Sequence, residues 1–210
     1  MNEKRILAVI LVFALVFRIA NALIFPIFEK PDEEPHFNYI NFVAENNKLP
    51  VQGKFYAEYF QPPFYNVAAS FILRIVKSFT QDIANQVIAM RFLSIIVSMF
   101  TLYFIYKIAS RLFKEKNLVL GIVAFAAFLP SYVNLNSTVT NSNMDYFLTT
   151  VIIYLGIDIL EKGVSISRVL LLGIVAGIGL LNRTTVISML ATIPFVLIAA
   201  YYPNIKKKLE

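Results

Sequence analysis

Residues 6–28 read ILAVILVFALVFRIANALIFPIF, and this apolar run, interrupted by one charge at Arg18, decides the fold class. A helix needs about 20 predominantly apolar residues to cross the ~30 Å hydrocarbon core of a bilayer, and the run supplies them. No small-residue cleavage site follows it. We therefore interpret the run as an uncleaved first membrane span and not as a signal peptide.

The composition extends this interpretation to the whole chain. Of its 210 residues, 58% are hydrophobic and 15% are charged, and the mean hydropathy is +0.68. Soluble domains are about half apolar and a quarter charged, so the sequence predicts an all-α integral membrane protein with a single membrane domain over residues 1–210. The chain has no cysteine, which excludes disulfides, thiolate metal sites and a cysteine nucleophile. The basic residues behind the net charge of +6 cluster beside apolar runs and orient a membrane protein, so we expect no nucleic-acid partner.

Six membrane spans fit the apolar runs best. The last two could form one run, but such a helix would be about 51 Å long, which exceeds the thickness of the bilayer. We therefore interpret the polar residues 182–185 as a break. The expected spans cover residues 6–28, 89–112, 118–136, 146–161, 168–182 and 184–202.

The long segment 29–88 is predicted to be an extracytoplasmic loop with two interfacial helices, over residues 33–46 and 63–79. In the second helix four polar residues form one stripe, which is typical of helices that lie at a membrane surface or line a wet groove. They are Asn66, Ser70, Arg74 and Lys77. If this segment does not cross, the short loops rich in Lys and Arg all face the cytoplasm, and so do both termini. The predicted location is the cytoplasmic (plasma) membrane.

The acidic run Asp32-Glu33-Glu34 and the single histidine, His36, are the first candidates for chemistry in this loop. A carboxylate at the mouth of a membrane cavity can act as a general base if it reaches the proton that it takes. The alternative is structural: Asp32 caps the helix that follows, and the other acids complement the N-terminus of that helix. His36 either orients Asp32 across one helical turn, contacts substrate, or is an ordinary hydrogen-bonding residue.

Further motifs follow in a definite order along the chain. PDEEPHF at residues 31–37 comes after the first span, YFQPPFY occupies 59–65, and Arg91 opens the second span. Leu129-Pro130 is followed by Asn-Met-Asp at 143–145, and GIVAGIGLLNR occupies 173–183. This series resembles the GT-C glycosyltransferases, membrane enzymes that use polyprenyl-phosphate sugars and include protein O-mannosyltransferases and lipid A aminoarabinose transferases. The family more often has lysine at the last position, and its enzymes are much longer. The chain thus looks like the N-terminal module of a longer enzyme, as a natural fragment or a truncated form, and we expect it to be inactive or nearly so alone.

The resemblance implies an inverting glycosyl transfer on the extracytoplasmic side. Asp32 would deprotonate an acceptor hydroxyl, which attacks the anomeric carbon of a polyprenyl-phosphate sugar. Glu33 would share the role of base or bind donor or acceptor. The departing phosphate needs cations to stabilise its charge, and Arg183 is the leading candidate. The alternative for Arg183 is snorkelling to lipid head groups.

Several other residues have two interpretations each. Arg91 and Lys54 either bind substrate phosphate or are lipid-facing or solvated charges. Arg18 lies inside the first span, where a charge is costly, and should pair with Asp145 or a donor phosphate, most simply as a structural ion pair. Gln61 either faces the cavity or shapes its proline-rich loop.

Asn143 and Asp145 either position the donor or cap the fourth span. Asp32, Glu33 and Asp145 could together supply oxygen ligands for a divalent metal ion, whose presence the sequence leaves open. The expected partners are a polyprenyl-phosphate sugar donor, membrane lipids and an acceptor of unknown class. Two rival functions remain: a non-catalytic binder or translocator of lipid-linked sugars, and a structural membrane subunit whose loop docks a partner.

Overall fold

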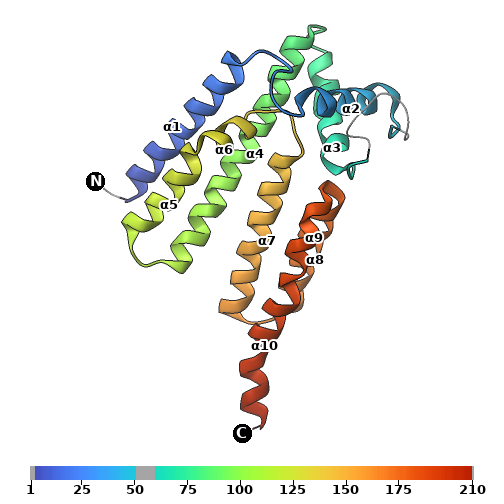
Figure 1. The fold of residues 1–210 in the computed structure, drawn as a ribbon. Coiled ribbons are helices and arrows are strands. Elements are labelled where there is room, and N and C mark those ends of the chain that lie inside the picture. The colour runs from blue at the N-terminus through green and yellow to red at the C-terminus, as the bar shows by residue number, and fades with distance from the viewer. Residues whose placement is uncertain (1–2, 51–59, 210) are drawn as a thin grey trace.

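The computed structural model describes residues 3–50 and 60–209, with side chains up to residue 202. The described residues form helices and no strand, which confirms the predicted all-α fold (Figure 1). The helices are α1 Glu3–Ile24, α2 Glu33–Asn46, α3 Phe64–Lys77, α4 Ile83–Leu112, α5 Lys116–Phe128, α6 Pro130–Leu135, α7 Ser142–Lys162, α8 Ile166–Asn182, the 3₁₀ turn η1 Thr184–Val186, α9 Ile187–Leu190 and α10 Thr192–Leu209.

Four segments in the described part are long and apolar enough to cross a membrane: α1, α4, α7 and the run Thr184–Tyr202. Of the predicted spans, 6–28 ends early, at Ile24, because Pro26 has no N–H with which to continue the helix. Span 89–112 begins earlier than predicted, at Ile83, where the Asp82 side chain accepts a hydrogen bond from the backbone N–H of Ala84 (3.1 Å).

The predicted span over 118–136 is not one continuous helix in the structure. Helix α5 has 13 residues and ends at Phe128, Leu129 is extended, and the short helix α6 begins at Pro130. The residue before a proline is disfavoured in the helical region, which explains the break. At about 20 Å, α5 is shorter than the ~30 Å hydrocarbon core.

The expected total of six spans is therefore not confirmed. Helix α8 is apolar but has 17 residues, and the last predicted span is divided into η1, α9 and α10. Pro194 lies in the first turn of α10, where a missing N–H is tolerated.

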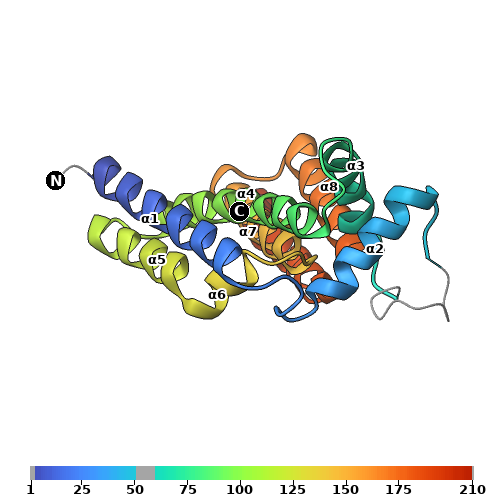
Figure 2. The ribbon, with the colours of Figure 1, turned by 90° about the horizontal axis from the view of Figure 1, so that it is seen from above.

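Both predicted interfacial helices are present, as α2 and α3. They pack against each other at one end of the bundle, opposite the end where the chain termini lie (Figure 1). Seen from above, α2 projects beyond the long helices (Figure 2). Nine buried side chains join α2 and α3 to α4 and to the loop before α7: Phe37, Ile40, Ala44, Tyr65, Ala69, Leu73, Val87, Met90 and Val139.

The polar stripe of α3 faces α2, which corrects the expectation that it faces head groups or a wet groove. Asn66 and Ser70 are fully buried. Arg74 donates hydrogen bonds to the carbonyls of Val43 and Ala44, at 3.0 and 2.9 Å, near the C-terminus of α2. The Val43 carbonyl also accepts from the backbone N–H of Asn47, and the Arg74 contacts fasten α3 to the last turn of α2.

Candidate functional site

The candidate site lies at the end of the bundle that carries α2 and α3. The turn between α1 and α2, the loop between α6 and α7, and the turn after α8 contribute to it. The α6–α7 loop and the first two residues of α7 read NSTVTNSN over 136–143, and most of their polar side chains are buried: Asn136, Ser137, Thr138, Thr140, Asn141 and Asn143. Buried polar groups require hydrogen-bond partners, so this loop is held by its neighbours.

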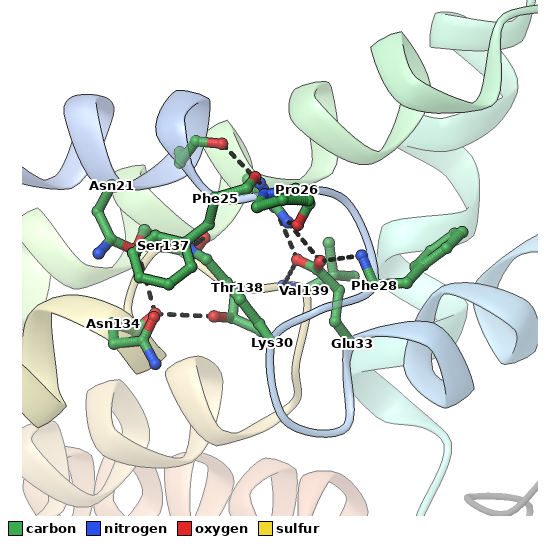
Figure 3. A network of polar contacts seen from close by, with 12 residues as sticks. Asn21, Phe25, Pro26, Phe28, Lys30, Glu33, Asn134, Ser137, Thr138 and Val139 are labelled. Carbon is green, nitrogen blue, oxygen red and sulfur yellow. Dashed lines mark hydrogen bonds and ion pairs between the residues drawn. The ribbon is translucent and has the colours of Figure 1, made fainter.

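Glu33 is the first residue of α2, and its carboxylate is fully buried (Figure 3). Oε1 accepts from Arg91 Nε at 2.8 Å and from the backbone N–H of Val139 at 3.2 Å. Oε2 accepts from Arg91 Nη2 at 2.5 Å and from the backbone N–H of Phe28 at 3.0 Å. Four donors thus converge on one inaccessible carboxylate. We conclude that the predicted role of Glu33 as base or substrate ligand does not fit this structure.

Arg91 on α4 uses all of its donors inside the protein, and it too is fully buried. Two of its five N–H groups bond to Glu33, and the other three bond to backbone carbonyls at the end of α1. The carbonyls are those of Ala22 (2.6 Å), Phe25 (2.8 Å) and Pro26 (2.8 Å). With no N–H left for a ligand, the predicted phosphate-binding role of Arg91 does not fit. Arg91 instead holds the turn between α1 and α2, which carries Asp32.

Asp32 is exposed, and its backbone lies in the left-handed region with φ 58. Asp32 occupies the predicted N-cap position of α2, but its side chain makes no capping hydrogen bond. Aspartate is among the residues that tolerate this conformation. Among the described residues, its carboxylate has no hydrogen-bond partner, in contrast to that of Glu33.

His36 lies one turn into α2, is 2% exposed, and packs edge-on against the Tyr65 ring with centroids 6.4 Å apart. Burial lowers its pKa from 6.5 to about 4; the nearby charge of Asp32 opposes this shift, and that of Arg183 reinforces it. The imidazole is therefore neutral at pH 7. Within the described residues no hydrogen bond joins the imidazole to Asp32. The two charges that act on its pKa belong to the predicted base, Asp32, and to the predicted phosphate ligand, Arg183.

Arg183 follows α8, and its Nη1 donates to Ser142 Oγ at 2.5 Å. In the part of the chain that the structure describes, its other guanidinium N–H groups have no hydrogen-bond partner. The neighbouring Asn182 and Asn141 exchange two hydrogen bonds: each side-chain amide donates to the other's carbonyl, at 3.2 and 3.3 Å. Asn141 also donates to Gln61. These bonds fasten the loops that carry Gln61 and Arg183 to one another.

Asp145 and Asn143 lie in the first turn of α7, and neither caps it, because the helix begins at Ser142. Asn143 is buried and donates to the Thr138 carbonyl at 3.0 Å, so it supports the preceding loop. Asp145 Oδ2 accepts from Thr185 at 3.2 Å. It lines a cavity of about 320 Å³ together with Thr185.

Three further predictions have clear outcomes. The predicted ion pair of Arg18 is wrong, because its partners are Ser98 Oγ (3.0 Å) and the carbonyls of Ala14 (3.1 Å) and Ala127 (3.0 Å). Over residues 3–50 and 60–209 no three acidic or histidine side chains are grouped as metal ligands, so the expected trio of Asp32, Glu33 and Asp145 is not assembled. Lys54 lies outside the described residues.

Four polar residues of this region were not among the predicted site residues: Lys30, Ser137, Asn141 and Asn182. Lys30 is 3% exposed and donates to Asn21 Oδ1 at 2.6 Å and to the carbonyl and hydroxyl oxygens of Ser137 at 2.7 and 3.1 Å (Figure 3). Burial lowers its pKa to about 8; the Arg91 charge adds to this effect and the Glu33 charge opposes it. The polar run 136–143 between apolar segments was the available signal.

One comparison with known proteins gave a match. A family model described as dolichyl-phosphate-mannose-protein mannosyltransferase matches residues 61–209. Comparisons with curated proteins and with solved structures found no match. The family match confirms the resemblance to membrane glycosyltransferases, and with the apolar helices it supports an integral membrane location. The acidic motif at 31–37 precedes the matched region.

Proposed function

The chain belongs to the dolichyl-phosphate-mannose-protein mannosyltransferase family, and from this premise we propose that it binds a polyprenyl-phosphate sugar and transfers the sugar to an acceptor hydroxyl. The observation that carries the proposal is the contrast between two adjacent acids. Glu33 is buried and fully hydrogen-bonded, whereas the Asp32 carboxylate is exposed and retains its acceptor capacity. A general base must reach its proton, so Asp32 takes this role.

In the proposed reaction, the acceptor hydroxyl gives its proton to Asp32 while its oxygen attacks the anomeric carbon. A new C–O bond forms, the bond from the anomeric carbon to the phosphate oxygen breaks, and its electron pair leaves with polyprenyl phosphate. Attack from the face opposite the leaving group inverts the configuration. The phosphate needs no proton from an acid, but its charge must be stabilised.

Arg183 is the proposed partner of that phosphate. Its guanidinium uses one nitrogen to contact Ser142, which leaves donors for a bidentate contact with phosphate oxygens. Its charge and that of Asp32 both act on His36, which supports a shared site.

The side of the membrane is also part of the proposal. Lys and Arg residues gather at the helix ends opposite α2 and α3, at the start of α5, the end of α7 and the start of α8. Such an excess is typical of the cytoplasmic side. The site would then face outward, with both termini cytoplasmic.

The experiment uses the full chain reconstituted in vesicles with radiolabelled polyprenyl-phosphate mannose and serine- or threonine-containing peptides as acceptors. Donor binding and sugar transfer are measured separately. Asp32→Asn should retain donor binding and lower transfer by about 10²–10⁴-fold. Glu34→Gln removes another exposed carboxylate of the same helical turn and is the matched control, expected to leave both quantities unchanged.

Arg183→Gln should weaken donor binding itself, because it removes the proposed phosphate contact. Transfer at the wild-type rate by Asp32→Asn would refute the assignment of the base. Wild-type transfer by this chain is expected to be low, because the chain resembles the N-terminal module of longer enzymes. Donor binding without transfer by a full-length enzyme that contains this module would support a non-catalytic binder of lipid-linked sugars.

A further inference from the structure

Among the residues that the structure describes, two buried cations have no acidic partner. Arg18 is 0% and Lys30 is 3% exposed, and neither forms a salt bridge with a described carboxylate. The acid beside them, Glu33, is already paired with Arg91. One terminal nitrogen of Arg18, Nη2, has no hydrogen-bond partner at all among the described residues. Uncompensated charges are costly in a membrane interior and point to a function.

A groove lies on the surface between α1 and the break that joins α5 to α6, and one residue of its lining, Asn21, contacts Lys30. Its volume is about 510 Å³, and it is lined by Phe13, Phe17, Asn21, Phe128, Pro130 and Val133. Phe17 and Asn21 flank Arg18 along α1, and Phe128 follows the residue whose carbonyl accepts from Arg18. Phe13 and Phe17 are 53% and 54% exposed, so the groove opens toward the bilayer.

Asn21 connects the groove to the buried lysine. Its Oδ1 accepts from Lys30 Nζ at 2.6 Å and from Ser137 Oγ at 2.5 Å, which fixes the orientation of the amide (Figure 3). Its Nδ2 has no hydrogen-bond partner within the described ranges. A cation bound to the oxygen of an amide polarises its N–H groups, so Asn21 offers a strengthened donor to a ligand in the groove.

We propose that this groove binds an anionic phospholipid of the bilayer. The phosphate accepts from the Asn21 amide, and one acyl chain lies along Phe13, Phe17 and Phe128. Asn21 is close to the end of α1 that carries the interfacial helices, and Phe13 lies about 12 Å further toward the bilayer centre. This is the direction in which a lipid chain runs from its head group. The negative phosphate offsets the field of Arg18 and Lys30.

The site is distinct from the proposed donor site. Arg183 follows α8 and does not border the groove, whose walls come from α1, α5 and α6. A bulk phospholipid reaches the groove by lateral diffusion because its aromatic walls face outward. Binding of phospholipid in the groove and binding of the sugar donor can therefore be tested independently.

A second groove provides an internal control. It has a similar volume, about 540 Å³, and lies between α1 and α4. No charged or amide side chain lines it; the lining residues are Leu11, Leu15, Ile95, Ile96, Met99, Phe100, Tyr103 and Phe104. A lipid chain can occupy this groove, but no amide donor lines it to hold a head-group phosphate, and no lining residue contacts Lys30.

The chain has no tryptophan, so one introduced indole reports on one groove. Phe13→Trp and Phe100→Trp are reconstituted in vesicles in which either phosphatidylglycerol or phosphatidylcholine carries brominated chains. Bromine quenches a neighbouring indole, and the ratio of quenching gives the relative affinity of the two lipids. Phe13→Trp should favour phosphatidylglycerol about fivefold, and Phe100→Trp should show a ratio near one.

Lys30→Met in the Phe13→Trp background should bring the ratio close to one. Equal quenching by both lipids in Phe13→Trp alone overturns the proposal, whatever the folding of the lysine variant. Farnesyl phosphate serves as a competitor. If it displaces lipid from the Phe13→Trp groove while phosphatidylglycerol shows no preference, the occupant is an isoprenoid phosphate and the assignment to a bilayer phospholipid is wrong.

Discussion

Replacement of Glu33 by glutamine tests whether the Glu33–Arg91 pair supports the structure or the chemistry. The variant removes the one negative charge that compensates buried Arg91. It also replaces an acceptor oxygen by an N–H₂ group that would face two donors, so two of the four hydrogen bonds to the carboxylate are lost. Breaking a buried ion pair by removing one partner costs about 3–5 kcal/mol. We expect Glu33→Gln to lower the free energy of unfolding by that amount.

The assay is reversible unfolding of the purified chain in mixed micelles of mild detergent and dodecyl sulfate, followed by helical circular dichroism. Glu45→Gln is the matched control. Glu45 also belongs to α2 and pairs with Lys77 at 2.5 Å, but its side chain is 55% exposed. Exposed pairs contribute about 0–1 kcal/mol, so the control should unfold nearly as the wild type does.

Two results would refute this reasoning. If Glu33→Gln costs no more than Glu45→Gln, the buried pair does not stabilise the turn between α1 and α2. If Glu33→Gln keeps wild-type stability and loses sugar transfer, Glu33 is catalytic and the division of roles between Glu33 and Asp32 is wrong.

Three further outcomes follow from the packing. A Cβ on Gly179 would lie 2.9 Å from Val186 Cγ1, so Gly179→Ala should destabilise by about 1–3 kcal/mol, whereas Gly177→Ala meets nothing within 4 Å and should be neutral or stabilising in the same unfolding assay. The pKa of His36 is about 4 in the folded protein and 6.5 in the unfolded chain. The neutral imidazole therefore contributes fully to the free energy of unfolding above pH 6.5, and this contribution is lost as the pH falls toward 4. The loss is up to about 3 kcal/mol, and His36→Gln should lack this dependence in unfolding measured from pH 7 to 4. Asn182→Ala breaks the amide pair that anchors the Arg183 turn and should cost about 1–3 kcal/mol, seen as faster proteolysis at that turn; an unchanged cleavage rate would contradict it.

Much of the architecture could be predicted from the sequence, because apolar length and helical periodicity act locally. The bounds 33–46 for α2 agree with the structure for this reason. The break at Leu129-Pro130 had an equally local signal, the restriction that proline imposes on its predecessor, but the apolar composition of 118–136 concealed it. Apolar length indicates that a segment can be buried in lipid, and it does not show that the helix is continuous.

The different environments of Asp32 and Glu33 also had a signal in the sequence. Positions 33, 36, 37 and 40 follow the helical spacing, and all four side chains are buried on one face of α2. Extending the apolar face back by one turn therefore places Glu33 inside. The position of Asp32 could not be derived in this way, because it depends on positive φ angles at Phe28 and Asp32 that are set by tertiary contacts.

The environment of Arg18 shows why the partners of a buried charge could not be predicted from the neighbouring sequence. A charge within a span suggests an acidic partner, yet Arg18 bonds to the Ala127 carbonyl near the end of α5. That carbonyl needs an external donor because α5 ends at Phe128 and its last carbonyls have no partners within the helix. The proline that shortens α5 thus creates the neutral acceptor that holds Arg18. A cation held by neutral groups is not neutralised by a carboxylate, and this is the charge that the proposed lipid phosphate would offset.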